Sequence, residues 1–189
     1  MREYTHEEFI NIISDMDDKQ LIEFSKQYGG YPVLFRMALD ERASHIPFIQ
    51  TGAAVIIKNS NDEILLQERT DREEWSLPGG CQELGEELLN TAIREIYEET
   101  GIKLNSNDIK LIDTLSGPKR KNTYPNGDIV YNNTSLYYAE VWDTDISNIR
   151  ENSETKRLQF FKIDELPNNL RDKDLIEAYL KFIKINKKG

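Results

Sequence analysis

The sequence predicts an α/β fold in which helices pack on a mixed β-sheet. Two observations carry this prediction. Segments that read as strands alternate along the chain with segments that read as helices, and two of the helical segments have an apolar stripe on one side. The 189 residues suffice for one domain with an extension, and a hydrophobic content of 38% is ordinary for a protein with a packed core.

The first part of the chain reads as helical. Residues 5–8 have the form of a capping box and precede apolar residues at helical spacing. A second helical pattern starts near residue 17 and stops at two glycines, 29–30, and Pro32 opens a third, short one that runs to about residue 42. We therefore divide the chain into a helical extension, 1–46, and a main domain, 47–189.

The main domain reads as strands, one long helix and a final helix. Residues 49–57 and 63–68 are strand-like and flank a turn cluster, and further strands are expected near 109–116, 129–142 and 157–162. A brief helical turn ends at Leu166 and Pro167, and a last amphipathic helix spans about 171–184. Polar loops are expected before residue 75 and at 143–156.

Composition argues against several classes of function. The net charge is −10, and nucleic-acid binders need clustered Lys and Arg, which are confined here to a short run at 118–121 and a lysine-rich carboxyl end. Two distant histidines argue against a His-based metal site or a Ser-His-Asp triad. One cysteine permits no internal disulfide, and no run of 18 apolar residues occurs. We expect a cytoplasmic protein without a membrane or nucleic-acid partner.

Glutamates crowd one helix of the main domain, predicted at 86–100. At 100° per residue, its apolar residues fall within an arc of about 140°, and Glu95, Glu98 and Glu99 within an adjacent arc of about 100°. Each alone reads as a solvated surface charge, but three carboxylates so close repel one another by roughly 1–3 kcal/mol per pair. A divalent cation would relieve this repulsion, and carboxylate oxygens suit Mg²⁺ or Mn²⁺.

The spacing of this segment resembles the Nudix box. Gly80 is followed after five residues by Glu86, after seven more by Arg94, Glu95 and Ile96, and then by Glu98, Glu99, Gly101 and Ile102 at the fixed gaps. Residues 75–80 are similar to the lead-in that many members carry, and the resemblance covers roughly residues 47–185. It implies a Nudix-type α/β/α sandwich that hydrolyses the pyrophosphate bond of a nucleoside diphosphate linked to another moiety, with water attacking phosphorus.

The resemblance also implies residue roles. Glu95, Glu98, Glu99 and the backbone carbonyl of Gly80 would bind the metal, Mg²⁺ or Mn²⁺. Arg94 would orient Glu95 and Glu86 by ion pairs, and Gly101 would end the helix in a left-handed conformation. The catalytic base stays open between the box glutamates Glu98 and Glu99 and a glutamate on a later loop, for which Glu154 is preferred to Glu151, although a solvated loop carboxylate is the ordinary reading of both.

The substrate is not fixed by the box. Arg69 could contact a phosphate and Tyr131 could stack on a base, while surface and packing roles are the ordinary readings. Pro118, sixteen residues after Ile102, has the spacing associated with ADP-ribose pyrophosphatases. ADP-ribose, nucleotide sugars and nucleoside triphosphates all stay open. The alternatives are a non-catalytic nucleotide sensor and an RNA-decapping hydrolase, and the extension could cover the cleft, form a homodimer or pad the fold.

Overall fold

The computed structural model describes residues 20, 47–70, 73–123, 129–142 and 155–186. The helices expected in 1–46 lie outside the described residues. So do the turn at 124–128 and the loop that contains Glu151 and Glu154.

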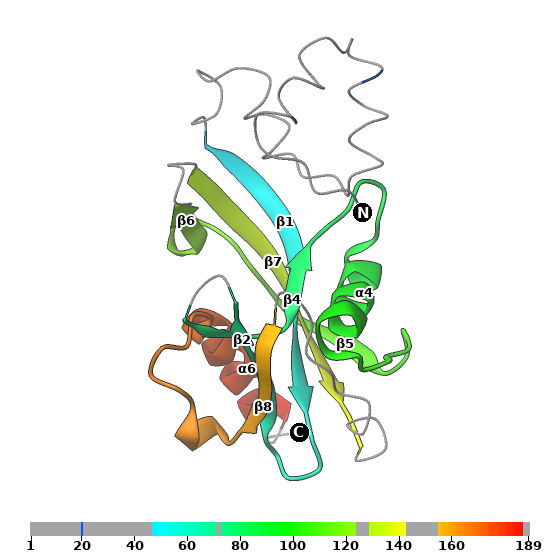
Figure 1. The fold of residues 1–189 in the computed structure, drawn as a ribbon, viewed down its shortest axis with the longest axis vertical. Coiled ribbons are helices and arrows are strands. Elements are labelled where there is room, and N and C mark those ends of the chain that lie inside the picture. The colour runs from blue at the N-terminus through cyan, green and yellow to red at the C-terminus, as the bar shows by residue number, and fades with distance from the viewer. Residues whose placement is uncertain (1–19, 21–46, 71–72, 124–128, 143–154, 187–189) are drawn as a thin grey trace.

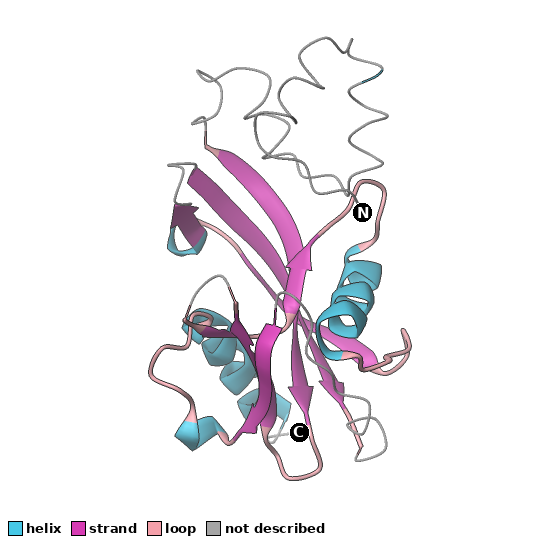
Figure 2. Ribbon diagram, viewed as in Figure 1, coloured by secondary structure: helices cyan, strands magenta, loops and turns pink. Residues whose placement is uncertain are grey.

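The described residues form an eight-stranded mixed sheet (Figures 1 and 2). Its strands are β1 (Phe48–Lys58), β2 (Ile64–Arg69), β3 (Trp75–Ser76), β4 (Gly79–Cys81), β5 (Ile109–Leu115), β6 (Lys121–Thr123), β7 (Ile129–Glu140) and β8 (Thr155–Phe161). The main order is β3-β2-β1-β7-β5, and β4, β6 and β8 pair with β1, β7 and β2. The long pair β1–β7 is parallel and the other pairs are antiparallel.

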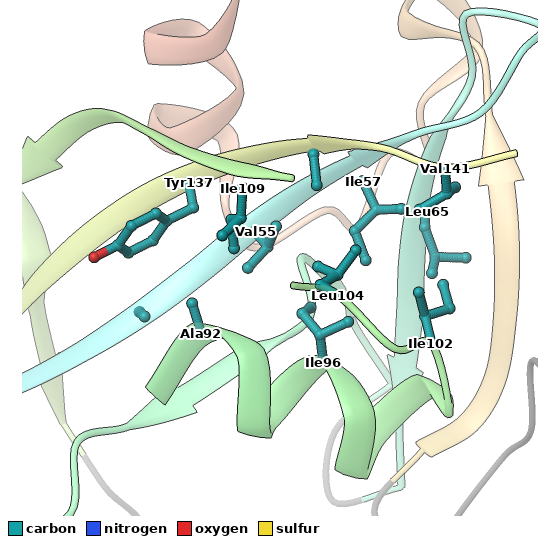
Figure 3. Packing of buried hydrophobic residues seen from close by; sticks show 12 residues of the cluster. Val55, Ile57, Leu65, Ala92, Ile96, Ile102, Leu104, Ile109, Tyr137 and Val141 are labelled. Atoms are coloured by element: carbon teal, nitrogen blue, oxygen red, sulfur yellow. The ribbon is translucent and has the colours of Figure 1, made fainter. Parts of the chain in front are cut away.

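Two helices, α4 (Leu88–Thr100) and α6 (Lys173–Asn186), cover opposite faces of this sheet (Figure 2). Successive side chains of a strand point to opposite faces. In β1, Val55 and Ile57 accordingly join the core under α4, whereas Ala54 and Ile56 join the core under α6. Figure 3 shows the first of these cores, in which Ala92 and Ile96 of α4 lie against Val55 of β1. The expected α/β/α sandwich is confirmed.

The five longer strands and both helices lie where the sequence predicted them, with ends shifted by a few residues. The helical turn before Pro167 is also present, as the 3₁₀ helix η2 (Ile163–Glu165). Short elements were missed: β3, β4, β6 and the 3₁₀ helix η1 (Pro118–Arg120). A strand of two or three residues is too short to show an alternating pattern. Such a strand is defined by its pairing partner, which is distant in sequence. Within the described residues, no helix is long and apolar enough to span a membrane.

Candidate active site

Helix α4 carries the glutamates on the side that faces β4. Its buried Ala92 and Ile96 anchor it to the sheet, and Gly101 ends it with a φ of 76°, while its amide donates to the Tyr97 carbonyl. The expected left-handed cap is confirmed. The helix starts at Leu88 and not at Glu86, because the backbone of Glu87 is extended. The Glu86 carboxylate, outside the helix, accepts hydrogen bonds from Thr91 and Arg94.

Arg94 is the centre of the ion pairs. Its Nε and one terminal nitrogen form a fork on the two Glu86 oxygens, at 2.9 and 3.0 Å, and its other terminal nitrogen contacts Glu95 Oε1 at 2.9 Å and Glu98 Oε2 at 3.2 Å. A further hydrogen bond of 3.0 Å goes to the Cys81 carbonyl. The expected ion pairs with Glu86 and Glu95 are present, and hydrogen bonding from Arg94 lowers the pKa of Glu86 to about 2.

Glu99 differs from its neighbours because it is buried, with 4% of its surface exposed. The helical projection grouped it with Glu95 and Glu98 on the polar side, but β4 covers it. Its Oε2 accepts a hydrogen bond of 2.7 Å from the Gly79 amide. Burial raises the pKa of Glu99 to about 7, although the Gln67 amide and the Gly79 amide act in the opposite direction. Burial disfavours the ionised form of this carboxyl group, and a bound cation would stabilise that form.

The backbone of β4 comes close to the carboxylates. A side chain on Gly80 would overlap the Glu95 carboxyl group, so this glycine leaves the space that Glu95 occupies. Glu98 is exposed, with 55% of its side-chain surface accessible. As placed in the described part of the chain, no three His, Cys, Asp or Glu side chains converge on one point as a ready metal site. The donor chemistry nevertheless fits a hard cation, since carboxylate and carbonyl oxygens are what Mg²⁺ and Mn²⁺ prefer.

A polar cavity of about 210 Å³ adjoins this cluster. Arg69, Gly79, Gly80 and Cys81 line it at the glutamate side. It continues over the face of the sheet that carries α6, because Gln50 and Asn132 are paired neighbours in β1 and β7 and alternate in phase with the core residues of that face. The cavity thus reaches from the β4 backbone, which contacts Glu95 and Glu99, onto the α6 face of the sheet.

The far side of the cavity is held by ion pairs. Arg120 of η1 donates to both oxygens of Asp174, at 3.0 and 3.1 Å, and to Thr134 Oγ1 at 2.8 Å. Asp172, just before α6, accepts a hydrogen bond of 3.0 Å from the Leu77 amide, and burial raises the pKa of Asp172. These contacts tie η1, α6 and the segment before β4 together.

The two residues proposed for substrate binding lie in different places. Arg69 lines the cavity. Tyr131 does not, because it alternates in phase with Tyr137, whose side chain belongs to the core under α4. Its binding role stays a prediction, and so does the catalytic role of Glu154.

Sequence reasoning missed a buried polar pair behind Glu99. Gln67, 1% exposed, accepts a hydrogen bond of 2.9 Å at Oε1 from the hydroxyl of Thr155, which directly follows Glu154 in the sequence. A glutamine that ends the apolar run 64–66 was the available signal. The cavity residues Gln50, Asn122, Asn132 and Asp172 were also missed, since each is an ordinary polar residue until the sheet brings them together.

Comparison with known proteins identifies the family. The sequence profile of the NUDIX domain matches residues 49–181, which is most of the chain. The chain therefore belongs to the Nudix hydrolase family, as the spacing of the box suggested.

Similar curated proteins match over short stretches. A putative 8-oxo-dGTP diphosphatase of Bacillus subtilis is 50% identical over 50 residues, which are 26% of this chain and 34% of that protein. An m7GpppN-mRNA hydrolase of Xenopus laevis is 39% identical over 61 residues, 30% of this chain and 21% of that protein. The chain thus spans 34% and 21% of the length of these two relatives.

Solved structures match over more of the fold. A MutT NUDIX hydrolase from Burkholderia pseudomallei is 25% identical, with a TM-score of 0.56, over 70% of this chain and 97% of that one. The NUDIX domain of Shewanella oneidensis NrtR, solved with ADP ribose, has a TM-score of 0.58 at 18% identity, over 76% of this chain and 93% of that one. At that identity the second match concerns the fold alone.

Proposed function

We propose that the protein is a metal-dependent pyrophosphohydrolase that cleaves a nucleoside diphosphate linked to another moiety. The observation that carries this proposal is Glu99, a carboxyl group buried against the β4 backbone, beside Glu95 and a polar cavity. Members of the family generally use a divalent metal. Here Glu95, Glu98, Glu99 and the Gly80 carbonyl would hold it, as Mg²⁺ or Mn²⁺.

The proposed reaction needs only a few protein groups. Water oxygen forms a bond to phosphorus, the bond from phosphorus to the bridging oxygen breaks, and the bridging oxygen leaves as part of a phosphate. A bound divalent cation supplies neutralisation of phosphate charge and a lower pKa for coordinated water. Arg94 keeps Glu86, Glu95 and Glu98 in place, and the Gly79 amide orients Glu99. The water proton would pass to Glu98, Glu99 or Glu154.

The range of substrates follows from the family and from the cavity. A nucleotide-derived small molecule is the substrate class, with ADP-ribose, a nucleotide sugar or a nucleoside triphosphate as members to test. The diphosphatase and mRNA-hydrolase relatives are named for different substrates, and their short matches do not choose between them. An acidic chain of net charge −10 disfavours RNA as substrate.

A hydrolysis panel tests the proposal. The protein is incubated with ADP-ribose, sugar nucleotides, dNTPs and capped RNA, with Mg²⁺ or Mn²⁺ and with EDTA. The Glu98→Gln variant is run beside Glu83→Gln, which changes an exposed glutamate of the same stretch. We expect metal-dependent turnover of one class, lost at least 100-fold in Glu98→Gln and kept in Glu83→Gln. Binding of nucleotide without turnover in any condition would replace the proposal by a nucleotide sensor.

A further inference from the structure

Two largely buried carboxyl groups hold the short segment that leads into β4. The Leu77 amide donates to Asp172 Oδ2 at 3.0 Å. The Gly79 amide donates to Glu99 Oε2 at 2.7 Å, and between them the Pro78 carbonyl accepts a hydrogen bond of 3.0 Å from β1. Asp172 lies just before α6 and Glu99 on α4, and these helices cover opposite faces of the sheet (Figure 2). The segment is therefore tied to both helices and to β1.

The residues before α6 lie alongside the same segment. Trp75 and Leu170 form a parallel bridge, in which the Trp75 amide donates to the Asn169 carbonyl at 3.3 Å and the Arg171 amide donates to the Trp75 carbonyl at 2.8 Å. The Asn169 side chain adds a hydrogen bond of 2.7 Å to the Glu73 carbonyl. The start of α6 is thus fixed against the chain that enters β4.

The Asp172 side chain serves this segment and not its own helix. Asp172 is the residue before the first turn of α6, and its carbonyl accepts from the Ile176 amide at 3.1 Å. An aspartate at this position commonly caps the free amides of its helix, which is worth about 0.5–2 kcal/mol. Here the Leu175 amide, which such a cap would satisfy, donates to Asp174 at 3.0 Å. The Asp172 carboxyl group is left for the Leu77 amide.

A hold on the Leu77 amide restrains the Gly79 amide as well. Leu77 precedes a proline, which restricts it to extended backbone angles, and the ring of Pro78 fixes its φ. The chain between the two amides therefore has little freedom. Glu99 is 4% exposed, so displacement of the Gly79 amide would leave a buried carboxyl group without its backbone donor.

We propose that Asp172 is a positioning residue for the metal site: by holding the Leu77 amide, it fixes the backbone that presents the Gly79 amide to Glu99. The inference rests on the proposed function, in which Glu99 is a metal ligand. Partners that orient a metal ligand commonly matter almost as much as the ligand itself. Asp172 would act in this way from the opposite face of the sheet.

Two substitutions separate the hydrogen bond from the charge. Asp172→Asn keeps an acceptor oxygen for the Leu77 amide, whereas Asp172→Ala removes it. Both remove the negative charge, whose Oδ1 atom lies 3.9 Å from Arg120 Nη1. Asp164→Ala is the matched control, because it removes the same charge from an exposed position in η2. Asp172→Ser, which keeps a cap for α6, replaces Asp172→Ala if the alanine variant does not fold.

Hydrogen exchange measured by NMR in EDTA tests the positioning without any metal. We expect Asp172→Ala to speed exchange of the Gly79 amide at least 10-fold, while Asp172→Asn and Asp164→Ala stay within 2-fold of the wild type. The Ile96 amide, in the middle of α4, should exchange at the same rate in all proteins. A general loss of stability would speed exchange at both amides. A wild-type rate at Gly79 in Asp172→Ala would overturn the inference.

A titration with Mn²⁺, followed by electron paramagnetic resonance, tests the consequence for the site. We expect Asp172→Ala to weaken Mn²⁺ binding at least 5-fold, with affinity restored to within 2-fold in Asp172→Asn. Because no substrate is present, a residue that only contacts substrate in the cavity would leave Mn²⁺ binding unchanged. Equal affinity of wild type and Asp172→Ala would contradict the inference. If the wild type binds no Mn²⁺, the proposed function fails, and the exchange rates alone decide whether Asp172 positions the Gly79 amide.

Discussion

At the scale of single residues, Glu99 and Arg94 have opposite electrostatic environments. Arg94 reaches four acceptor groups, so the carboxylates around it are compensated. Glu99 is buried with an amide of Gly79 as its backbone partner, and its pKa is raised. The difference indicates that Glu99 is the member of the cluster that depends most on a cation.

The raised pKa predicts a pH-dependent stability. The Glu99 pKa is about 7 in the folded, metal-free protein, against 4.5 as its ordinary value, so the folded state keeps a proton that the unfolded chain releases between these values. The free energy of unfolding should therefore fall as pH rises from about 4.5 to about 7, by up to about 3 kcal/mol from this group. Urea denaturation in EDTA across this range measures it.

The Glu99→Gln variant supplies the comparison. Since glutamine does not titrate, the unfolding free energy of the wild type, taken relative to that of the variant, should fall as pH rises from about 4.5 to about 7. Two curves that run parallel from pH 4.5 to pH 7 would show that Glu99 titrates normally.

Arg94 predicts a loss of stability on a substitution that keeps its charge. Lysine cannot reproduce the fork on Glu86 together with the contacts to Glu95 and the Cys81 carbonyl. Arg94→Lys should lower the free energy of unfolding by about 1–3 kcal/mol, measured by urea denaturation. Lys162→Arg is the control, because both partners of its ion pair with Glu165 are exposed, and the change should alter stability by less than about 1 kcal/mol. Equal losses of unfolding free energy in both variants would contradict a structural role for Arg94.

At the scale of elements, strand β4 decides how the glutamates are presented. It pairs with β1 through Gly52, Ala53 and Ala54, and it places the Gly79 amide on Glu99 and Gly80 against Glu95. Three residues of strand thus position two carboxylates of a helix.

The two glycines predict different outcomes for the same substitution. At Gly79 a Cβ would overlap the Ala53 backbone, and its φ of 149° disfavours other residues. Gly79→Ala should therefore lower the melting temperature markedly. At Gly80 the Cβ would meet the Glu95 carboxyl group, a flexible side-chain end, so Gly80→Ala should fold with a smaller loss but lower metal-dependent hydrolysis at least 10-fold. Melting curves and kcat/KM test the pair, and a Gly80→Ala enzyme with wild-type kcat/KM would contradict this geometry.

The sequence predicted the elements that have a local signal. The strands around Val55 and Leu65 are apolar runs that flank a turn cluster, both helices have an apolar stripe, and all four lie close to the expected positions. Strand β4 and η1 could not be predicted in this way. Their positions depend on pairing with β1 and on the ion pair between Arg120 and Asp174, which are contacts distant in sequence.

At the scale of the whole molecule, the site combines a local motif with a non-local cavity. The box glutamates and Arg94 are neighbours on one helix, so their spacing alone brought them together in the prediction. The helical projection placed Glu99 beside Glu95 and Glu98, but it could not show that Glu99 is buried. Gln50, Asn122, Asn132 and Asp172 come from four separate segments, and only the folded sheet brings them to one cavity.

The net charge of the whole molecule makes a bound cation important for binding an anionic substrate. A chain of net charge −10 repels an anionic substrate unless positive charge is supplied locally. Arg69, Arg120 and Arg171 provide some at the cavity, but Arg120 is already paired with Asp174. We therefore expect the proposed hydrolysis to require a metal at the glutamates, which would compensate the charge of Glu99 and neutralise the substrate phosphates.

Binding of Mn²⁺ tests this requirement most directly. Electron paramagnetic resonance counts free Mn²⁺ during a titration of the wild type, Glu98→Gln and the control Glu83→Gln, without any need for a substrate. We expect saturable binding by the wild type and by Glu83→Gln, weakened at least 10-fold in Glu98→Gln while the melting temperature in EDTA stays the same. Equal binding by all three proteins, or none by the wild type, would show that the crowded glutamates are not a metal site.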